Sequence, residues 1–352
     1  MTRSKHNTMD GLMRYANYLG FGNLSIKIDH KTGLQAIVAI HSTKLGPAIG
    51  GCRMLHYAST EKAIEDALRL GYMMSYKAAI TGLPHGGAKS VLMRPRVIKD
   101  RVAYFEAFGE FMNELGGHYI TAVDSGTSPQ EMDIIATKTK FVTCTTASGS
   151  TGDPSPITAL GVKRGMEAAV KFKLGRDTLE GVHVAIQGLG HVGYALAKGL
   201  YNDGAKLTIS DVNTATMARC ADEFKTATCS ADEIFDVKAD VFSPNALGSV
   251  LNRETINRLK VSIVAGAANS QLAHHEYGTM LLERGILYAP DFLINAGGLI
   301  YVAVFYAKGT HEEALIKIDK IYNMTYDIFE RSAKENIATN IIAKRIAYER
   351  LY

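Results

Sequence analysis

Two lysines in apolar, glycine-punctuated surroundings are the residues most suited to chemistry in this chain. Lys77 and Lys89 lie twelve residues apart, and Gly86 and Gly87 come shortly before Lys89. Glycine has no Cβ, so backbone or a ligand can approach closely there. A lysine in such a place either extends its amine into water or is a desolvated amine whose pKa is lowered for catalysis. The choice between these two states decides what the protein does.

A glycine-rich segment further along the chain predicts a dinucleotide site. Gly188-Leu189-Gly190-His191-Val192-Gly193 follows a strand-like run and opens a helix-like one. The next strand-like run ends in Asp211. Glycines permit a tight turn near pyrophosphate, the helix N-terminus favours an anion, and an acidic residue at this distance accepts hydrogen bonds from ribose. The acidic residue would repel a 2′-phosphate, so NAD is predicted over NADP. The alternative is a glycine-rich turn that binds nothing. The predicted cofactor residues are Gly188, Gly190, His191, Val192, Gly193 and Asp211.

The elements that must position these residues follow from hydrophobic periodicity. After Gly181 apolar runs alternate with helical patterns, which favours a parallel, doubly wound sheet. The expected strands are 182–187, 206–211, 239–243, 261–265 and 286–289. Earlier in the chain we expect a strand over 34–41 and a helix from Glu61 with Thr60 as its N-cap. The segment from 312 to 352 predicts two amphipathic helices.

Composition narrows the class of protein. The 352 residues carry a formal net charge of +4 and are 47% hydrophobic. No Lys/Arg-rich block favours nucleic acid or a membrane surface. The polar start of the chain lacks a signal-peptide pattern, and four scattered cysteines are typical of a reducing compartment. We therefore expect a cytoplasmic protein with no nucleic-acid or membrane partner. His274-His275-Glu276 lacks the spacing of a metal site, so no metal is expected.

Six motifs occur in an order that resembles one enzyme family. They are Gly46 to Gly51, Met74 to Lys77, Gly86 to Lys89, Ala122 to Asp124, the 188–193 loop, and Tyr288-Ala289-Pro290-Asp291 through Asn295-Ala296-Gly297-Gly298. Together they resemble the Glu/Leu/Phe/Val amino-acid dehydrogenase family, and most of all its leucine dehydrogenases. The resemblance extends from about residue 34 to about residue 303.

The resemblance implies a two-domain α/β fold with a cleft between the domains. Residues 1–148 would form a substrate-binding and oligomerisation domain, and 149–325 an NAD-binding Rossmann domain. The boundary falls in the Gly/Ser/Pro-rich segment 145–156. The C-terminal helices, 326–352, would pack back onto the first domain. A homo-oligomer is expected.

The implied reaction is reversible oxidative deamination of an L-amino acid to a 2-oxo acid and ammonia, with NAD as oxidant. Lys77 would pair with the substrate carboxylate, Lys89 would activate water, and Asp124 would handle protons on the amino group. To act as a base near neutrality, Lys89 must fall from a pKa of about 10.4 to roughly 7–8. Burial and the positive Lys77 would lower that pKa, whereas Asp124 would oppose them.

The other implied site residues concern the substrate and the nicotinamide. Gly50 and Gly51 would shape the substrate floor, Thr158 would support the carboxamide, and Asn269 and Asn295 would lie near the nicotinamide. The presumed side-chain pocket is apolar, which favours leucine, valine or isoleucine; its residues are Ile49, Ala122, Leu299 and Val302.

Departures from the family pattern leave two alternatives open. Tyr301 replaces a smaller residue and keeps an aromatic, phenylalanine-type substrate possible. Ala88 stands where a third glycine is expected, and Ser125 follows Asp124 in place of an apolar residue. These two departures support a catalytically silent, NAD-binding sensor as a further alternative. One methylene changes binding in an apolar pocket by only about 1–3 kcal/mol, so leucine and valine cannot be ranked.

Overall fold

The computed structural model describes residues 9–147, 150–246 and 248–352. The chain divides into two compact units. Unit 1 comprises Met1–Asp153, Val302–Gly309 and Ala347–Tyr352, and unit 2 comprises Pro154–Tyr301 and Thr310–Ile346. The predicted two-domain α/β class is confirmed. The predicted boundary between 148 and 149 lies outside the described residues and stays a prediction.

Unit 1 is built on a five-stranded sheet with the order β1-β2-β4-β3-β5. The strands are β1 (Asn23–Asp29), β2 (Leu34–Ser42), β3 (Ala48–Leu55), β4 (Gly86–Met93) and β5 (Tyr119–Val123). β3, β4 and β5 run parallel, whereas β2 is antiparallel to both β1 and β4. The parallel strands carry or immediately precede the chemistry-bearing residues of this unit.

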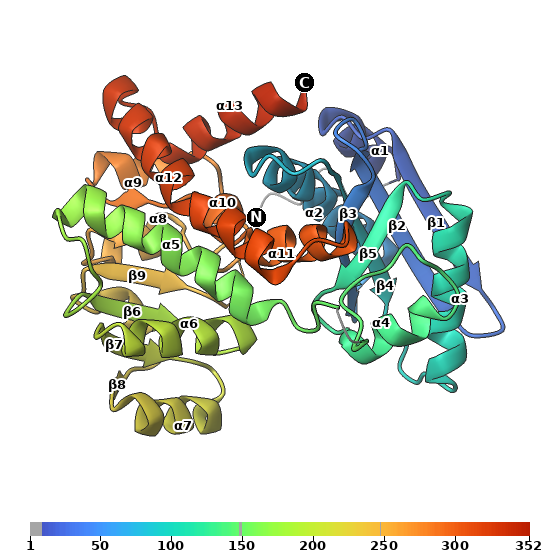
Figure 1. Cartoon of the computed structure of the whole chain (residues 1–352), viewed down its shortest axis with the longest axis horizontal. Coiled ribbons are helices and arrows are strands. Elements are labelled where there is room, and N and C mark those ends of the chain that lie inside the picture. The colour runs from blue at the N-terminus through green and yellow to red at the C-terminus, as the bar shows by residue number, and fades with distance from the viewer. Residues whose placement is uncertain (1–8, 148–149, 247) are drawn as a thin grey trace. The chain divides into compact units, whose positions relative to one another are not determined.

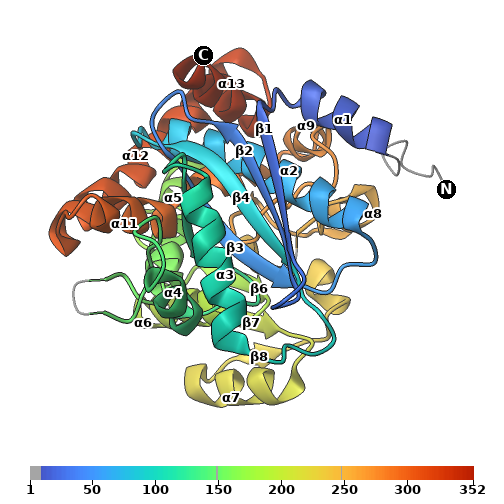
Figure 2. The same ribbon diagram turned by 90° about the vertical axis from the view of Figure 1, so that its right-hand side faces the viewer.

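Helices cover both faces of this sheet (Figure 2). Helix α2 (Thr60–Ile80) packs on β4 and β2, while α3 (Arg101–Glu114) and α4 (Pro129–Ala136) lie on the other face. α1 (Met9–Tyr18) contacts α2. The expected N-cap of α2 was wrong by one residue: the hydroxyl of Ser59, rather than Thr60, accepts a hydrogen bond from the Lys62 amide at 3.3 Å. Ser59 alone has the extended backbone that an N-cap requires.

Unit 2 contains a parallel six-stranded sheet with the order β11-β10-β9-β6-β7-β8, as a doubly wound fold requires (Figure 1). All five predicted strands are present and each is shorter than predicted; the strand expected over 239–243 is Val241–Pro244 and ends one residue later than predicted. The strands are β6 (His183–Gln187), β7 (Lys206–Ser210), β8 (Ala227–Thr228), β9 (Val241–Pro244), β10 (Ile263–Val264) and β11 (Leu287–Tyr288). β8 was not predicted because its two residues are exposed and form no apolar run.

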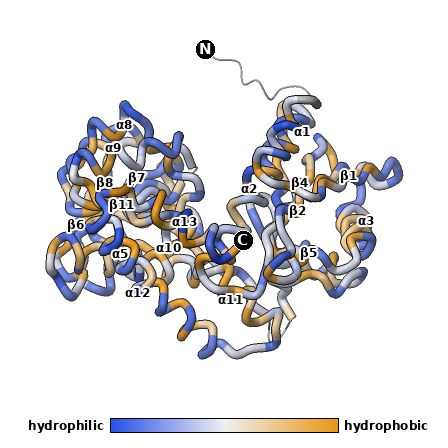
Figure 3. The backbone as a smooth tube through the Cα atoms, turned by 90° about the horizontal axis from the view of Figure 1, so that it is seen from above, coloured by the Kyte–Doolittle hydropathy of each residue, from blue (hydrophilic) through white to orange (hydrophobic). Residues whose placement is uncertain are grey.

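The helices that follow Pro154 alternate with these strands or come after them, and two of these helices end in segments that belong to unit 1, Val302–Gly309 and Ala347–Tyr352. They are α5 (Ser155–Leu174), α6 (His191–Asn202), α7 (Thr214–Phe224), a 3₁₀ turn (Glu233–Asp236), α8 (Arg253–Arg258), α9 (Tyr277–Glu283), α10 (Asp291–Ile294), α11 (Gly297–Tyr306), α12 (His311–Glu335) and α13 (Thr339–Leu351). Apolar and polar residues alternate along the helices of both units (Figure 3). None of the described helices has the length and apolar character needed to cross a membrane.

The C-terminal segment differs from the expectation that 326–352 packs back on the first domain. Residues 326–346 belong to unit 2, because α12 buries its apolar face on α5, with the Phe172 and Phe329 ring centroids 5.5 Å apart. Of this segment, only Ala347–Tyr352 groups with unit 1. There the Arg350 guanidinium donates to the Ile80 carbonyl at the end of α2, and the Lys44 amine donates to the Tyr352 carbonyl at 2.9 Å.

Candidate active site

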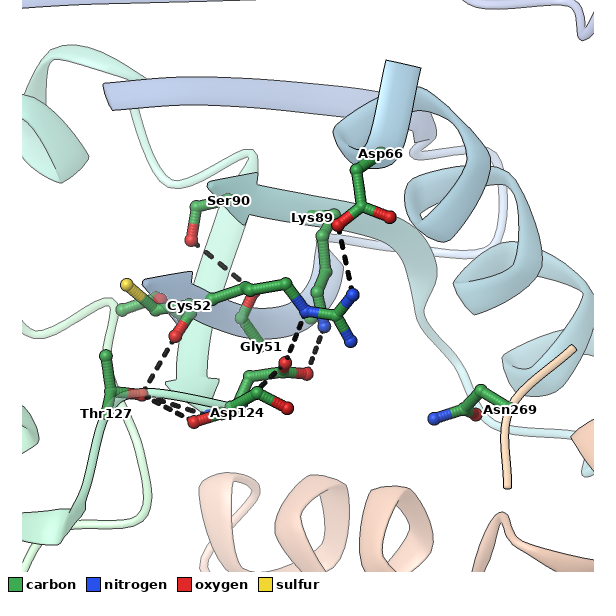
Figure 4. Close-up of polar contacts among 12 residues, drawn as sticks. Gly51, Cys52, Asp66, Lys89, Ser90, Asp124, Thr127 and Asn269 are labelled. Carbon is green, nitrogen blue, oxygen red and sulfur yellow. Dashed lines mark hydrogen bonds and ion pairs between the residues drawn. The ribbon is translucent and has the colours of Figure 1, made fainter. Parts of the chain in front are cut away.

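Three adjacent strands of unit 1 bring the predicted catalytic residues together. Lys89 lies in β4, Gly50 and Gly51 lie in β3, and Asp124 directly follows β5. β3 pairs with both of the other strands, and Gly51 is in register with Ala122. This register places the start of the β5–α4 loop beside the middle of β3, so that Asp124 lies next to Gly51 and faces Lys89 (Figure 4).

Lys89 is a buried amine rather than a surface lysine. The residue is 4% exposed, and its Nζ donates a hydrogen bond to Oδ2 of Asp124. Burial lowers the pKa of Lys89 below its ordinary value; Asp124 opposes this shift, and the positive charge of Arg53 adds to it. The cation that we expected to repel Lys89 was Lys77. Arg53 is a further cation that acts on the amine, and the effect of Lys77 stays a prediction.

Asp124 is fixed by donors on both of its oxygens. Oδ1 accepts from Nε of Arg53 at 2.9 Å and from the Ser125 amide at 2.7 Å, while Oδ2 accepts from Lys89. Burial alone would raise the pKa of Asp124, but Lys89 and Arg53 outweigh it and hold that pKa well below its usual range. Asp124 is therefore a carboxylate at neutral pH.

Sequence reasoning missed a second layer of charged residues behind this pair. Nη1 of Arg53 lies 3.0 Å from Oδ2 of Asp66, a residue of α2. Asp66 also accepts from the Tyr57 hydroxyl at 2.8 Å and from Nη2 of Arg69 at 2.8 Å. The available signal was Arg53 itself, a charged residue inside an otherwise apolar and glycine-rich strand.

Lys77 lies near the C-terminal end of α2, on the layer directly above β4. It is 8% exposed, and its carbonyl accepts a hydrogen bond from the Thr81 hydroxyl at 2.8 Å. Gly87 permits this packing, because a Cβ there would overlap the Ser75 backbone of α2. The two lysines therefore lie on two elements that pack closely on each other, Lys77 on α2 and Lys89 on β4.

Glycines at 50 and 51 are required by close neighbours. A Cβ on Gly50 would overlap the Ala88 carbonyl, and a Cβ on Gly51 would lie 2.7 Å from Cβ of Asp124. Ala88, the residue that departs from the family pattern, is itself completely buried in β4 and in register with Ile40. Ser125 contributes through its backbone, since its amide donates to Asp124 and its carbonyl accepts from the Met54 amide.

The expected apolar pocket residues are distributed over three elements. Ile49 in β3 is fully buried, and Ala122 in β5 and Val302 in α11 are nearly so. Leu299, half-buried, precedes Val302 by three residues on the same helix, so the two lie on one face of α11. Val302 groups with unit 1 and Leu299 with unit 2. Tyr301 lies between them, and its hydroxyl is 3.2 Å from Nδ1 of His311.

The 188–193 loop in unit 2 has the local geometry of a nucleotide-binding turn. Gly188 has a φ of +92°, and a Cβ on Gly193 would overlap the Gly188 carbonyl, so the loop folds tightly against α6. A Cβ on Gly190, by contrast, would meet no described atom within 4 Å. His191 opens α6 and is exposed, with Val192 half-buried behind it. The loop thus presents open space at a helix N-terminus, which suits a diphosphate.

Polar groups at the ends of β6 and β7 complete this region. Oδ2 of Asp211 accepts from the Leu189 amide of the loop at 2.6 Å, and Oδ1 accepts from the Asn213 amide at 2.7 Å. Oε1 of Gln187 and Oγ of Ser210 are buried without a hydrogen-bond partner among the described residues. Buried polar atoms of this kind mark places where a ligand or water completes the bonding. The residues present therefore fit a dinucleotide.

The remaining predicted residues of unit 2 are held by polar contacts. Nδ2 of Asn295 donates to Oδ1 of Asn269 and to the Ala267 carbonyl, each at 3.0 Å. The Thr158 hydroxyl lies in the first turn of α5 and donates to the Pro154 carbonyl at 3.1 Å. The structure thus brings Asn269 and Asn295 into direct contact.

Comparisons with known proteins agree with this arrangement. Residues 22–141 match the model of the Glu/Leu/Phe/Val dehydrogenase dimerisation domain, and residues 213–347 match that of Glutamate/Leucine/Phenylalanine/Valine dehydrogenase. The leucine dehydrogenase of Thermoactinomyces intermedius is 50% identical over 325 residues, which cover 92% of this chain and 88% of that protein. The chain belongs to the Glu/Leu/Phe/Val dehydrogenase family.

Two further proteins are similar to this chain over most of its length. A phenylalanine dehydrogenase from Caldalkalibacillus thermarum is 41% identical, with 92% of this chain and 89% of that protein covered. The crystal structure of L-tryptophan dehydrogenase from Nostoc punctiforme superposes with a TM-score of 0.80 at 36% identity, covering 96% and 98% of the two chains. The predicted resemblance is confirmed, and the protein is an amino-acid dehydrogenase, an oxidoreductase whose family uses a nicotinamide cofactor.

Proposed function

We propose that the protein catalyses the reversible, NAD-dependent oxidative deamination of a branched-chain L-amino acid to its 2-oxo acid and ammonia. The observation that carries the proposal is the buried Lys89 amine, with a lowered pKa, bonded to the Asp124 carboxylate. The relatives named leucine dehydrogenase, at 50% and 45% identity, support the branched-chain substrate.

Lys77 and Lys89 have different roles in this proposal. Lys77 anchors the substrate α-carboxylate, for which a compact cation suffices. Lys89, as a neutral amine, removes a proton from the water that attacks the imine carbon. Asp124 receives and returns the proton of the substrate amino group. Gly50 and Gly51 shape the substrate floor by letting the Ala88 backbone and the Asp124 side chain approach β3 closely.

The cofactor residues of the proposal lie in unit 2. The diphosphate binds at the Gly188–Gly193 loop, where Gly190 leaves open space, and the Asp211 carboxylate accepts hydrogen bonds from the adenosine ribose. The negative charge of Asp211 disfavours a 2′-phosphate, so NAD is used rather than NADP. Asn269 and Asn295, with Thr158, orient the nicotinamide. When bound, the nicotinamide accepts the hydride from the substrate Cα.

The substrate side chain binds against apolar residues in this proposal. Ile49, Ala122, Leu299 and Val302 offer no cation for a second carboxylate, which disfavours glutamate. An aromatic substrate is the second candidate, and the observation that favours it is the large residue Tyr301, which precedes Val302 in the sequence. The lower identity to the phenylalanine dehydrogenase, 41% against 50%, favours the branched-chain substrate.

We also propose that the chain forms a homo-oligomer through unit 1. The match of residues 22–141 to a dimerisation domain supports this proposal. Light scattering of the purified protein measures the assembly, and a monomer at micromolar concentration contradicts it.

The function is tested by the formation of reduced cofactor with a panel of L-amino acids at mildly alkaline pH. We expect turnover with leucine, valine and isoleucine, slower turnover with phenylalanine, and a preference for NAD. Lys89→Met removes the amine and keeps the alkyl stem, so kcat should fall roughly 10²- to 10⁴-fold. Lys62→Met, at an exposed lysine of α2, is the matched control and should retain activity. Absence of turnover with every amino acid, together with NAD binding that survives in Lys89→Met, would favour the silent sensor.

A further inference from the structure

Arg53 bridges two carboxylates that belong to different layers of unit 1. Its Nε lies 2.9 Å from Oδ1 of Asp124 and its Nη1 lies 3.0 Å from Oδ2 of Asp66. The Arg53 side chain is 16% exposed. A guanidinium presents donors in a rigid plane, so two simultaneous contacts fix its position and its orientation.

The far end of this bridge is itself anchored. Asp66 belongs to α2 and accepts hydrogen bonds from Arg69 on Oδ1 and from the Tyr57 hydroxyl on Oδ2, each at 2.8 Å. With Arg53, which donates to Oδ2, each oxygen of Asp66 is engaged. Figure 4 shows the contact of Asp66 with the arginine. The chain Asp66–Arg53–Asp124–Lys89 therefore connects α2, β3 and β4 through the β5–α4 loop.

Charged and titratable groups from α2, β3 and β5 lie near the Lys89–Asp124 pair. Arg53 faces it from β3 and Asp66 from α2, and both act on the charge of Lys89. Cys52 of β3 and Tyr119 of β5 are also near Asp124, but burial raises the pKa of the Cys52 thiol to about 12 and raises that of Tyr119. These two groups remain neutral over the working range of the enzyme. Arg53 thus places a cation beside the pair, with its Nε 2.9 Å from Oδ1 of Asp124.

We propose that Arg53 is a positioning residue for the dehydrogenase reaction: anchored by Asp66, it holds the Asp124 carboxylate toward Lys89 and its charge favours the neutral amine of Lys89. The inference rests on the roles proposed above for Lys89 and Asp124. Arg53 acts through these two residues and takes no proton itself.

The two neighbours of the pair must shift its titration in opposite directions. Arg53 repels the ammonium form of Lys89, so its removal raises the pKa of Lys89. Asp66 attracts the ammonium form, so neutralising Asp66 lowers that pKa. Because the reaction needs the neutral amine, the rising limb of the pH profile should move with the Lys89 pKa.

The experiment compares four variants in the oxidation of L-leucine by NAD, with kcat/KM measured from about pH 6 to about pH 11 over the titration range of a lysine whose pKa is lowered. They are Arg53→Gln, Arg53→Lys, Asp66→Asn and the control Arg101→Gln. Arg101 forms another arginine–carboxylate pair in the same unit, with its Nη2 2.7 Å from Oε1 of Glu131, and its side chain is 46% exposed. Circular dichroism establishes that each variant is folded.

We expect Arg53→Gln to lose roughly 10²-fold in kcat/KM through misplacement of Asp124, and to move the limb up by on the order of one pH unit. Arg53→Lys should keep the limb near that of the parent protein and restore part of the rate. Asp66→Asn should move the limb down, and Arg101→Gln should overlay the parent profile.

The outcomes separate this inference from the function on which it depends. An unmoved limb in Arg53→Gln, with a uniform loss of rate, overturns the positioning role and makes Arg53 a structural residue only. If Arg53→Gln does not fold, Asp66→Asn decides, and a limb that stays in place or rises overturns the inference. An inactive parent protein overturns the proposed function itself, before any variant is compared.

Discussion

At the scale of single residues, the state of Lys89 depends on three opposing influences. Burial penalises its charged form, Asp124 stabilises that form, and Arg53 destabilises it again. Burial and Arg53 prevail, since the pKa of Lys89 is lowered, while Asp124 remains ionised. The pKa of Lys89 is thus shifted in the direction that a base near neutrality requires, and its partner Asp124 is held as a carboxylate.

Gly51→Ala is predicted to impair catalysis more than stability. The new Cβ would lie 2.7 Å from Cβ and 2.8 Å from Oδ2 of Asp124. Asp124 must move, so kcat/KM for L-leucine should fall about 10²-fold, with a loss of stability of about 1–3 kcal/mol from overpacking. Steady-state kinetics and urea unfolding measure the two effects. Gly22→Ala is the control, because a Cβ there would meet no described atom within 4 Å. Unchanged kinetics in Gly51→Ala would contradict the close approach of Asp124.

The sequence singled out Lys89 and Asp124, which are in contact in the structure, but not the charged residues behind them. Lys77 and Lys89 were identified because lysines rarely lie among apolar residues and glycines. Arg53 and Asp66 were missed because what distinguishes them is their contacts in the folded chain, which no sequence motif marks. Arg53 and Asp124 are 71 residues apart in the chain, and only the strand register brings them together.

At the scale of elements, the turn from β6 into α6 contains two glycines with different tasks. Gly193 is required by protein packing, since a Cβ there would overlap the Gly188 carbonyl. Gly190 is not required in this way, because its surroundings are open and its extended backbone is accessible to any residue. A substitution at Gly190 therefore tests ligand binding, whereas a substitution at Gly193 tests the packing of the loop.

Gly190→Ala should leave the fold intact and weaken NAD binding. The methyl group occupies the space proposed for the diphosphate, and we expect at least about a tenfold rise in Kd, equivalent to about 1.4 kcal/mol. Calorimetric titration with NAD measures this change, and the thermal midpoint without NAD should equal that of the parent protein. Gly193→Ala should instead lower that midpoint. Equal affinity for NAD in Gly190→Ala and the parent protein would place the diphosphate elsewhere.

Elements with strong periodicity were predicted best. The strands of unit 2 were identified from their apolar runs, and α12 from its amphipathic spacing. α13 is present as predicted, but its apolar residues do not form a single face. β8 escaped because it is a two-residue edge strand with no apolar residue pattern. The prediction that residues 326–352 pack on the first domain differed from the structure for 326–346. An amphipathic pattern shows that a helix has an apolar face but not which element packs against that face.

At the scale of the whole molecule, the two units differ in how their acidic groups are held. In unit 1 the pKa values of Asp124, Asp66 and Glu131 are lowered although burial opposes the shift in each case, because cations or hydrogen-bond donors outweigh it. In unit 2 the carboxyls with lowered pKa values lie on the surface, and surface ion pairs contribute little to stability. These are Asp222, Asp232, Glu233 and Asp236.

Mild acid should therefore open unit 1 before unit 2. A carboxyl whose folded-state pKa is lowered contributes stability that is present above its unfolded pKa, about 4, and is lost as the pH falls through the folded value. A buried carboxyl that is about tenfold more acidic in the folded state than in the unfolded state stabilises the folded state by about 1.4 kcal/mol at neutral pH.

Digestion by pepsin between about pH 4 and pH 2, the interval in which carboxyls with lowered pKa values gain their protons, measures the order of opening. Mass spectrometry of the fragments should show cleavage within residues 34–144 accelerating more steeply than cleavage within 183–301 as the pH falls. The ratio of the two rates cancels the pH dependence of the protease itself. Digestion by thermolysin at neutral pH is the control, since the carboxylates of unit 1 are then ionised and the ratio should favour unit 1 far less. Equal acceleration in both units would mean that the network around Asp124 does not stabilise unit 1.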